Sequence, residues 1–184
     1  MIYVALLRGI NVGGKNKINM TMLKKTFEQI GMGSVMTYIN SGNIIFTDKE
    51  HSKRELATIL EKAILADFGL SIKVLVRSFN DFKEIIEYLP KTWKNDQDMK
   101  SDVLFLWDEI DEESLLEKLV IKPDIDTIKY VSGSILWSVD RKNSTRSGMM
   151  KLASSKLYKQ VTIRNVNTTR KIYDLMQDLR NRQG

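Results

Sequence analysis

The 184-residue sequence contains no cysteine, a single histidine and only two prolines. Without cysteine, the chain has no disulfide framework, no zinc–thiolate site and no cysteine nucleophile. The histidine, His51, lies in a polar segment without a cluster of carboxylates, so we expect it at the surface. The sequence therefore predicts no metal site and no serine–histidine–aspartate triad, and no residue pattern points to a cofactor.

Long apolar runs and low-complexity segments are missing as well. A membrane-spanning helix needs about 20 apolar residues, and no segment approaches that length. The apolar run that begins at Ile2 has no basic leader before it, which does not suit a secretion signal. Hydrophobic residues make up 42% of the chain, which is enough for a packed core. We expect a folded cytoplasmic protein that does not enter a membrane, and no oligomeric state is indicated.

Charge is unevenly distributed along the chain. Residues 91–140 contain six lysines and no arginine against twelve acidic residues, a net charge of −6. Residues 141–184 contain five lysines and six arginines against Asp174 and Asp178, a net charge of +9. Such a positive field would attract phosphates and other polyanions. Alternatively, a solvated basic helix without a ligand would give the same residue counts. Composition leaves both interpretations open.

Hydrophobic spacing predicts a mixture of strands and helices. Short apolar or β-branched runs indicate strands, and apolar residues that recur at helical spacing indicate helices. In the first half, the expected order is strand 2–7, helix 20–30, a hairpin of strands 35–40 and 43–47, helix 52–68, strand 71–76 and helix 80–89. In the second half, it is strand 102–107, helix 112–119, a hairpin of strands 127–131 and 135–139, helix 145–158, strand 161–164 and helix 168–180.

The same β-α-β-β-α-β order thus occurs twice, each time followed by an extra helix. This repetition predicts an α+β fold that is a tandem duplication of two ferredoxin-like units. The expected division is a first subdomain at residues 1–90, a polar linker at 91–100 and a second subdomain at 101–184. The first and third strands of such a unit are central neighbours. The loop 8–17 and the turn 40–43 should therefore lie side by side.

The first candidate site is the glycine-rich segment from Arg8 to Lys15. Its glycines let backbone amides approach a ligand closely, and the flanking cations would hold a phosphate. Gly9–Lys15 also has the spacing of a P-loop, but Asn16 stands where magnesium binding requires Ser or Thr, so a P-loop is not favoured. A tight turn without a ligand is the alternative. The predicted ligand-binding residues of this segment are Arg8, Asn11, Gly13 and Gly14.

Two further segments contain candidate ligand-binding residues. The turn Ser41-Gly42-Asn43 would add the neutral side chains of Ser41 and Asn43 to the same site, unless it is only a turn. A second cluster of Arg164, Asn165 and Asn167 precedes or opens the last helix, where free amides and the positive dipole end favour an anion. Plain helix capping is the alternative there.

These segments also carry a family resemblance. The motifs are RGINVGG at residues 8–14, Y-x-x-SGN at 38–43 and RN-x-NT at 164–168, and the correspondence runs nearly the full length. On these motifs the chain resembles the bacterial domain of unknown function 1697 family. The resemblance implies a tandem ferredoxin-like α+β architecture and no particular activity. The family typically has Trp in the last motif, where this chain has Val166.

The leading functional hypothesis is a binding module for a phosphate-bearing ligand, either a nucleotide or a nucleic acid. A second hypothesis is an enzyme that acts on a small phosphorylated or carboxylated substrate, with Arg8 as the oxyanion or phosphate clamp and no evident general base. A third is a protein-interaction scaffold, which would present an exposed apolar patch. A deep pocket with a buried titratable group would favour the enzyme, and a broad basic surface would favour nucleic-acid binding.

Overall fold

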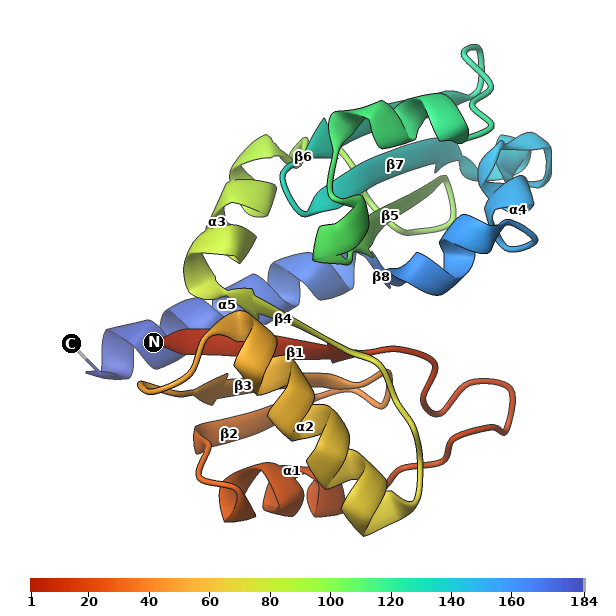
Figure 1. The fold of residues 1–184 in the computed structure, drawn as a ribbon. Coiled ribbons are helices and arrows are strands. Elements are labelled where there is room, and N and C mark those ends of the chain that lie inside the picture. The colour runs from red at the N-terminus through yellow and green to blue at the C-terminus, as the bar shows by residue number, and fades with distance from the viewer. Residues whose placement is uncertain (184) are drawn as a thin grey trace. The chain divides into compact units, whose positions relative to one another are not determined.

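The computed structural model describes residues 1–183 and has a mixed α+β fold (Figure 1), which confirms the predicted class. The chain divides into two compact units. One consists of Met1–Phe82 together with the C-terminal residues from Ile172 onward, and the other of Lys83–Lys171. Each unit contains one four-stranded antiparallel sheet. The chain passes from one unit to the other within α3 (Phe79–Tyr88) and again within α5 (Val166–Gln183).

The sheet of the first unit has the strand order β2-β3-β1-β4, and all neighbouring strands are antiparallel. Its elements are β1 (Ile2–Leu7), α1 (Met20–Gln29), β2 (Gly33–Tyr38), β3 (Asn43–Thr47), α2 (Lys53–Phe68) and β4 (Val74–Ser78). The bounds of β1 and β3 are those predicted from the sequence. Strand β4 lies later in the chain than the predicted strand at 71–76.

Local signals explain where α2 begins and ends. The Ser52 side chain accepts a hydrogen bond from the Glu55 backbone N–H, and the Glu55 side chain accepts one from the Ser52 backbone N–H. This capping box satisfies donors that the first helical turn leaves open. Gly69 ends the helix with a φ of +66°, and its N–H donates to the Leu65 carbonyl oxygen. Helix α2 therefore forms where the sequence predicts it.

Helices α1 and α2 cover one face of this sheet with a shared apolar core. The Phe46 ring of β3 lies 5.8 Å from the Tyr3 ring of β1 and 5.7 Å from the Phe27 ring of α1, measured between ring centres. Burying each such side chain contributes about 1.5–3 kcal/mol to folding. Other fully buried members of this core are Ala5, Leu7, Leu23, Ile44, Leu56, Leu60 and Ile64.

The sheet of the second unit has the matching order β6-β7-β5-β8, again with all neighbours antiparallel. Its strands are β5 (Met99–Leu106), β6 (Asp126–Val131), β7 (Ser134–Asp140) and β8 (Val161–Asn165). Trp137 is fully buried on one face of this sheet, among Leu104, Leu106, Ile135, Leu115 and Leu152. None of the helices in residues 1–183 is long and apolar enough to cross a membrane.

The helices predicted at 112–119 and 145–158 do not form as regular α-helices. Glu113–Lys118 is a 3₁₀ segment in which Leu115 is the buried residue. The region after β7 consists of short pieces: the 3₁₀ segment Arg141–Arg146, the one-turn helix α4 (Met149–Leu152) and the 3₁₀ segment Lys156–Gln160. The prediction of two longer helices was therefore wrong.

Contacts that are distant in sequence explain the broken second helix. The Asp126 carboxylate accepts hydrogen bonds from the Gly148 N–H at 2.9 Å and from the Ser147 hydroxyl, which fixes the chain just before α4. A Cβ atom on Gly148 would lie 1.7 Å from the Val120 carbonyl oxygen, so the two segments touch closely. After α4, the Ser155 hydroxyl donates to the Leu152 carbonyl oxygen at 2.7 Å. Such a side-chain bond competes with continuation of the helix.

Gly42 brings the β2–β3 turn against the end of β1. The Leu7 backbone N–H donates to the Gly42 carbonyl oxygen at 2.8 Å. Gly42 has a φ of +82°, and a Cβ atom there would lie 2.8 Å from the Leu7 Cβ and 2.9 Å from the Ile10 Cδ1. The left-handed backbone and the lack of space both require glycine. The prediction that the loop 8–17 and the turn 40–43 lie side by side is confirmed.

We expect Gly42→Ala to lower the free energy of unfolding by about 2–5 kcal/mol, because backbone strain adds to overpacking against Leu7 and Ile10. Gly13→Ala is the matched control, since Gly13 has a φ of +58° with nothing within 4 Å of an added Cβ. Gly13→Ala should lower the free energy of unfolding by about 1–2 kcal/mol, from backbone strain alone. Urea denaturation followed by circular dichroism measures both. Equal losses in the two variants would contradict the close contact at Gly42.

Candidate functional site

The glycine-rich segment folds into a short β-hairpin. Val12 and Lys15 form a β-bridge, with the Lys15 N–H donating to the Val12 carbonyl oxygen at 3.1 Å. Outside this pair, the Asn11 N–H donates to the Asn16 carbonyl oxygen at 3.1 Å. Gly13–Gly14 occupies the turn with φ angles of +58° and +74°, as a type I′ turn requires. The segment is therefore a hairpin, whereas a P-loop would lead directly into its helix.

Asn11 ties this hairpin to two neighbouring segments. Its side-chain Nδ2 donates to the Asn40 carbonyl oxygen at 2.8 Å and to the Ile18 carbonyl oxygen at 3.1 Å. Its Oδ1 accepts a hydrogen bond from the Ile18 N–H at 2.8 Å. The amide side chain thus holds the hairpin in place, and a ligand would meet a preformed site.

The predicted residues of the Ser-Gly-Asn turn also have structural bonds. Asn43 is fully buried, and its Nδ2 donates to the Tyr38 carbonyl oxygen and to the Ser41 Oγ, each at 3.0 Å. These bonds close the β2–β3 turn. Asn43 therefore shapes the turn next to the hairpin and has no exposed surface for a ligand.

An open pocket of about 560 Å³ lies beside the hairpin. Two of its residues, Asn11 and Gly14, are among those predicted from the sequence, whereas Arg8, Gly13, Ser41 and Asn43 do not line it. The rest of the lining was not predicted from the sequence. Lys17 could have been predicted from the sequence, because it continues the basic segment beyond Lys15. The lining residues are Asn11, Gly14, Lys17, Ile18, Asn19, Met20 and Asn40.

The N-terminal segment that supplies most of the pocket lining contains cations and no acid. Residues 1–27 contain five Lys and Arg residues and no acidic residue, and Glu28 is the first acid in the sequence. Lys15 and Lys17 are exposed. Helix α1 begins at Met20, so the positive end of its dipole is at the pocket. The Asn19 Oδ1 caps this helix by accepting from the Met22 N–H at 3.1 Å. An anionic ligand would meet cations and neutral amides here.

Arg164 is buried in β8, where it bonds to its own strand. Its Nη1 donates to the Thr162 Oγ1 at 3.0 Å and to the Ile163 carbonyl oxygen at 2.9 Å. Burial lowers the pKa of the guanidinium to about 10. Asn165 follows it and accepts a hydrogen bond from the Thr168 N–H at 2.9 Å, which caps α5. Asn165 therefore caps a helix, which was the alternative to ligand binding for this segment.

Asn167 and two arginines bind the segment between α3 and β5. The Asn167 Nδ2 donates to the Asn95 carbonyl oxygen at 2.8 Å, and the Arg141 Nη2 donates to the Asn95 Oδ1 at 3.1 Å. Arg170 donates to the carbonyl oxygens of Trp93 at 2.7 Å and Pro90 at 2.9 Å. These side chains belong to the basic segment 141–184 and hold the linker that was predicted at residues 91–100. The net charge of segment 141–184 therefore overstates the number of cations that a ligand could reach.

Asp102 is a candidate functional residue that was not predicted from the sequence. It is 8% exposed and pairs across the sheet with Asn165 of β8. Burial raises the pKa of its carboxyl, and the charges of Lys100 and Arg141 offset only part of that effect. Buried acids with a raised pKa are frequent at functional sites. The available signal was an acidic residue inside the apolar run SDVLFL.

His51 pairs with Asp48 at the start of α2. Its Nδ1 lies 2.9 Å from the Asp48 Oδ1, and 35% of its side chain is exposed. The hydrogen bond to Asp48 raises the pKa of the imidazole. Within residues 1–183, no group of three or more His, Asp or Glu side chains is arranged to hold a metal ion.

Two antiparallel sheets, helices and a basic glycine-rich hairpin define an α+β protein with a small open pocket. A family model described as "Protein of unknown function (DUF1697)" matches residues 1–137, and the chain belongs to this family. The predicted resemblance to this family is thereby confirmed. The RN-x-NT segment at 164–168 lies outside the matched residues.

A solved structure supports the same fold. The conserved bacterial protein SP0830 from Streptococcus pneumoniae is 32% identical to this chain, with a TM-score of 0.81. The alignment covers 95% of this chain and 98% of that one. A search among curated proteins gives no match.

We expect Asp102→Asn to raise the free energy of unfolding at pH 7. A carboxyl with a raised folded pKa costs stability above its unfolded pKa of about 3.9, because the unfolded chain loses the proton more readily. The gain should therefore vanish at lower pH, where the carboxyl is protonated in both states. Asp98→Asn is the control, since Asp98 is exposed and the charge change is the same. Urea denaturation at several pH values measures the difference, and an equal effect of Asp102→Asn at pH 3 and pH 7 would contradict the raised pKa.

Proposed function

We propose that this protein is a binding module for a phosphate-bearing ligand of nucleotide size, held in the pocket beside the glycine-rich hairpin. The observation that carries the proposal is the combination of an open pocket of about 560 Å³ with a lining of one lysine and several amides and no acid. This volume is within the range of about 300–1,000 Å³ that small-molecule sites occupy. The start of α1 adds backbone amides and a positive dipole end, which favour phosphate.

The residues divide into two roles in this proposal. Lys17 in the lining and Lys15 on the hairpin would contact the phosphate directly, because both are exposed cations. Asn11 and Gly14 would keep the hairpin in the conformation that forms the pocket, since Asn11 bonds to Ile18 and Asn40. Arg8, Gly13, Ser41 and Asn43 would act through the geometry of the hairpin and the turn.

We also propose that the two halves are a tandem duplication of a ferredoxin-like unit. Their strand orders correspond, as β2-β3-β1-β4 and β6-β7-β5-β8. A second correspondence supports this origin. The Leu7 N–H donates to the Gly42 carbonyl oxygen at 2.8 Å, and the Leu106 N–H donates to the Gly133 carbonyl oxygen at 3.0 Å. Each bond joins the end of a central strand to the glycine of a hairpin turn.

The duplication bears on function through the loops that follow the two corresponding strands. The loop after β1 contains Arg8, Lys15 and Lys17 and no acid. The segment Asp108–Glu113 after β5 contains five acidic residues and no cation. Since the fold accepts opposite charges at this place, it does not require the cations of the first loop. Binding of a negatively charged ligand would account for the cations of the loop after β1.

An enzyme acting on a small phosphorylated or carboxylated substrate is the second candidate, favoured by Asp102. A buried carboxyl with a raised pKa is suited to proton transfer. A screen of phosphate and carboxylate esters for turnover tests this function, with Asp102→Asn expected to abolish any turnover found.

We expect the double variant Lys15→Gln/Lys17→Gln to bind AMP at least tenfold more weakly than the wild type, because each lost charge-assisted hydrogen bond removes about 1.5–3 kcal/mol. Lys25→Gln/Lys49→Gln is the control, with two exposed lysines outside the pocket lining and the same charge change. Isothermal titration calorimetry at about 0.15 M salt measures the affinities.

Parallel titrations with a single-stranded RNA and a single-stranded DNA separate nucleotide from nucleic-acid binding. For a nucleic acid, each lost phosphate contact should reduce the slope of log K against log salt by about 1. Absence of saturable binding to AMP and to both oligonucleotides would refute the proposal. So would equal affinities of the pocket variant and the control variant.

A further inference from the structure

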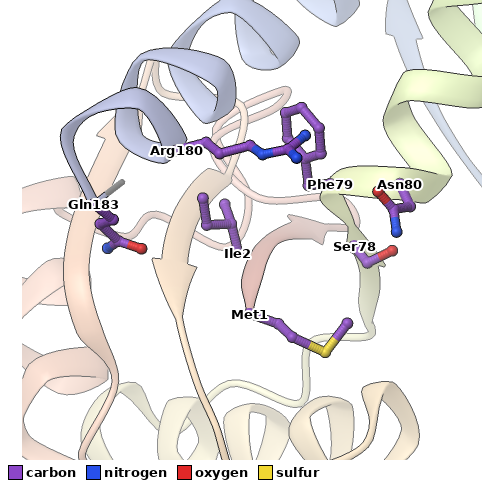
Figure 2. Close-up of a pocket in the computed structure, with 7 residues that line it drawn as sticks. All are labelled: Met1, Ile2, Ser78, Phe79, Asn80, Arg180 and Gln183. Carbon is purple, nitrogen blue, oxygen red and sulfur yellow. The ribbon is translucent and has the colours of Figure 1, made fainter.

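A second pocket, of about 260 Å³, lies in the unit that contains β1 and the C-terminal part of α5. Figure 2 shows Arg180 extending toward the Phe79 ring, with Ile2 and Met1 below it and Gln183 and Asn80 on either side. The pocket therefore combines an apolar floor with one cation and polar side-chain ends. It shares no lining residue with the pocket beside the hairpin.

The Arg180 guanidinium is oriented by an aromatic ring. Its central carbon lies 4.8 Å from the centre of the Phe79 ring. Phe79 in turn stacks on Tyr173, with 5.4 Å between ring centres and 25° between planes. Tyr173 and Arg180 are two helical turns apart on α5, so both reach Phe79 from the same side of that helix. A guanidinium stacked on a ring keeps its N–H groups at the edge, where they can bind a planar anion.

Among residues 1–183, no carboxylate forms an ion pair with Arg180, whose guanidinium lies over the Phe79 ring. The acid closest to the pocket along the chain is Asp81, in the first turn of α3. Its carboxylate bonds to the Lys53 Nζ at 2.8 Å and accepts from the Ser78 N–H at 2.7 Å. The charge of Asp81 is thus compensated by Lys53, and the pocket retains the positive charge of Arg180.

The floor of the pocket is apolar and only partly covered. Ile2 and Phe79 retain 8% and 7% exposure, and Met1 is 67% exposed. The volume is below the range of about 300–1,000 Å³ that is usual for drug-sized ligands, so the occupant should be small. Arg180 is the one charged side chain in the lining, and the Met1 ammonium donates to the Asp48 carbonyl oxygen. One charged side chain suits a monoanion better than a doubly charged phosphate. The fork of an arginine matches the two oxygens of a carboxylate.

We propose that this pocket is a binding site for a small monocarboxylate with an apolar or aromatic body. Arg180 binds the carboxylate with two parallel hydrogen bonds. The Asn80 amide lines the same pocket and can donate to its oxygens, as can the second N–H of Gln183, whose Nε2 also donates to the Ser34 Oγ at 3.4 Å. The apolar body lies against Ile2, Phe79 and the Met1 side chain. This site is independent of the function proposed for the hairpin pocket.

Benzoate is a suitable probe, because it has a carboxylate, an aromatic body and a small volume. The wild-type chain with ¹³C-labelled methionine methyl groups is titrated with benzoate, and the Met1 methyl signal is followed by NMR. Benzamide and phenyl phosphate are titrated in parallel as a neutral and a doubly charged analogue. Arg180→Gln is the test variant, and Arg182→Gln is its matched control, since Arg182 is exposed on the same helix and does not line the pocket.

The expected result is a saturable shift of the Met1 signal with benzoate. The dissociation constant should rise at least tenfold in Arg180→Gln and for benzamide, because both lose charge-assisted hydrogen bonds. It should stay within twofold of the wild type in Arg182→Gln. Circular dichroism of Arg180→Gln verifies that the variant is folded. Absence of a saturable shift would overturn the proposal, as would equal binding of benzamide, tighter binding of phenyl phosphate, or unchanged binding in Arg180→Gln.

Discussion

The close approach of Gly42 to the end of β1 is the contact on which the candidate site beside the hairpin depends. The Leu7 N–H bonds to the Gly42 carbonyl oxygen, and no side chain fits between the two segments. Asn11 then connects the hairpin to Asn40 and Ile18 through both ends of its amide. These bonds join backbone groups and one short side chain, so they hold the hairpin in place without a ligand. The side chains of Lys15 and Lys17 are exposed and are not among the groups that make these bonds.

Charge in this protein has two distinct uses. In the second unit, Arg141 and Arg170 bond to backbone carbonyl oxygens of the segment that precedes β5, and Arg164 bonds within β8. Such cations stabilise the fold by satisfying carbonyl groups. Around the hairpin, Lys15 and Lys17 are exposed, and the first 27 residues contain no acid to pair with them. A count of basic residues along the sequence cannot separate these uses, because they differ only in what the side chains contact.

We propose different anions for the two pockets. The hairpin pocket combines Lys17 with amides and a helix start, which is the usual surrounding of a phosphate. The smaller pocket places Arg180 above an apolar floor, which suits a carboxylate on an apolar body. Asp102 adds a third feature, a buried carboxyl that costs stability at neutral pH. Buried acids with a raised pKa are frequent at functional sites, and this is the physical basis of the enzyme alternative.

Local signals in the sequence determined much of the first unit: the bounds of β1 and β3, the capping box and terminal glycine of α2, and a glycine turn at Gly42. Backbone hydrogen bonding within a few residues decides such features, so the sequence suffices to predict them. Tertiary structure alone decided the rest. Gly148 breaks a predicted helix because the Val120 carbonyl lies against it, and Asn43, predicted to bind a ligand, is buried in its own turn. Tertiary packing also brings Arg180 over the ring of Phe79, which lies about a hundred residues earlier in the chain. Contacts between distant segments depend on how the whole unit packs, and no local pattern encodes them.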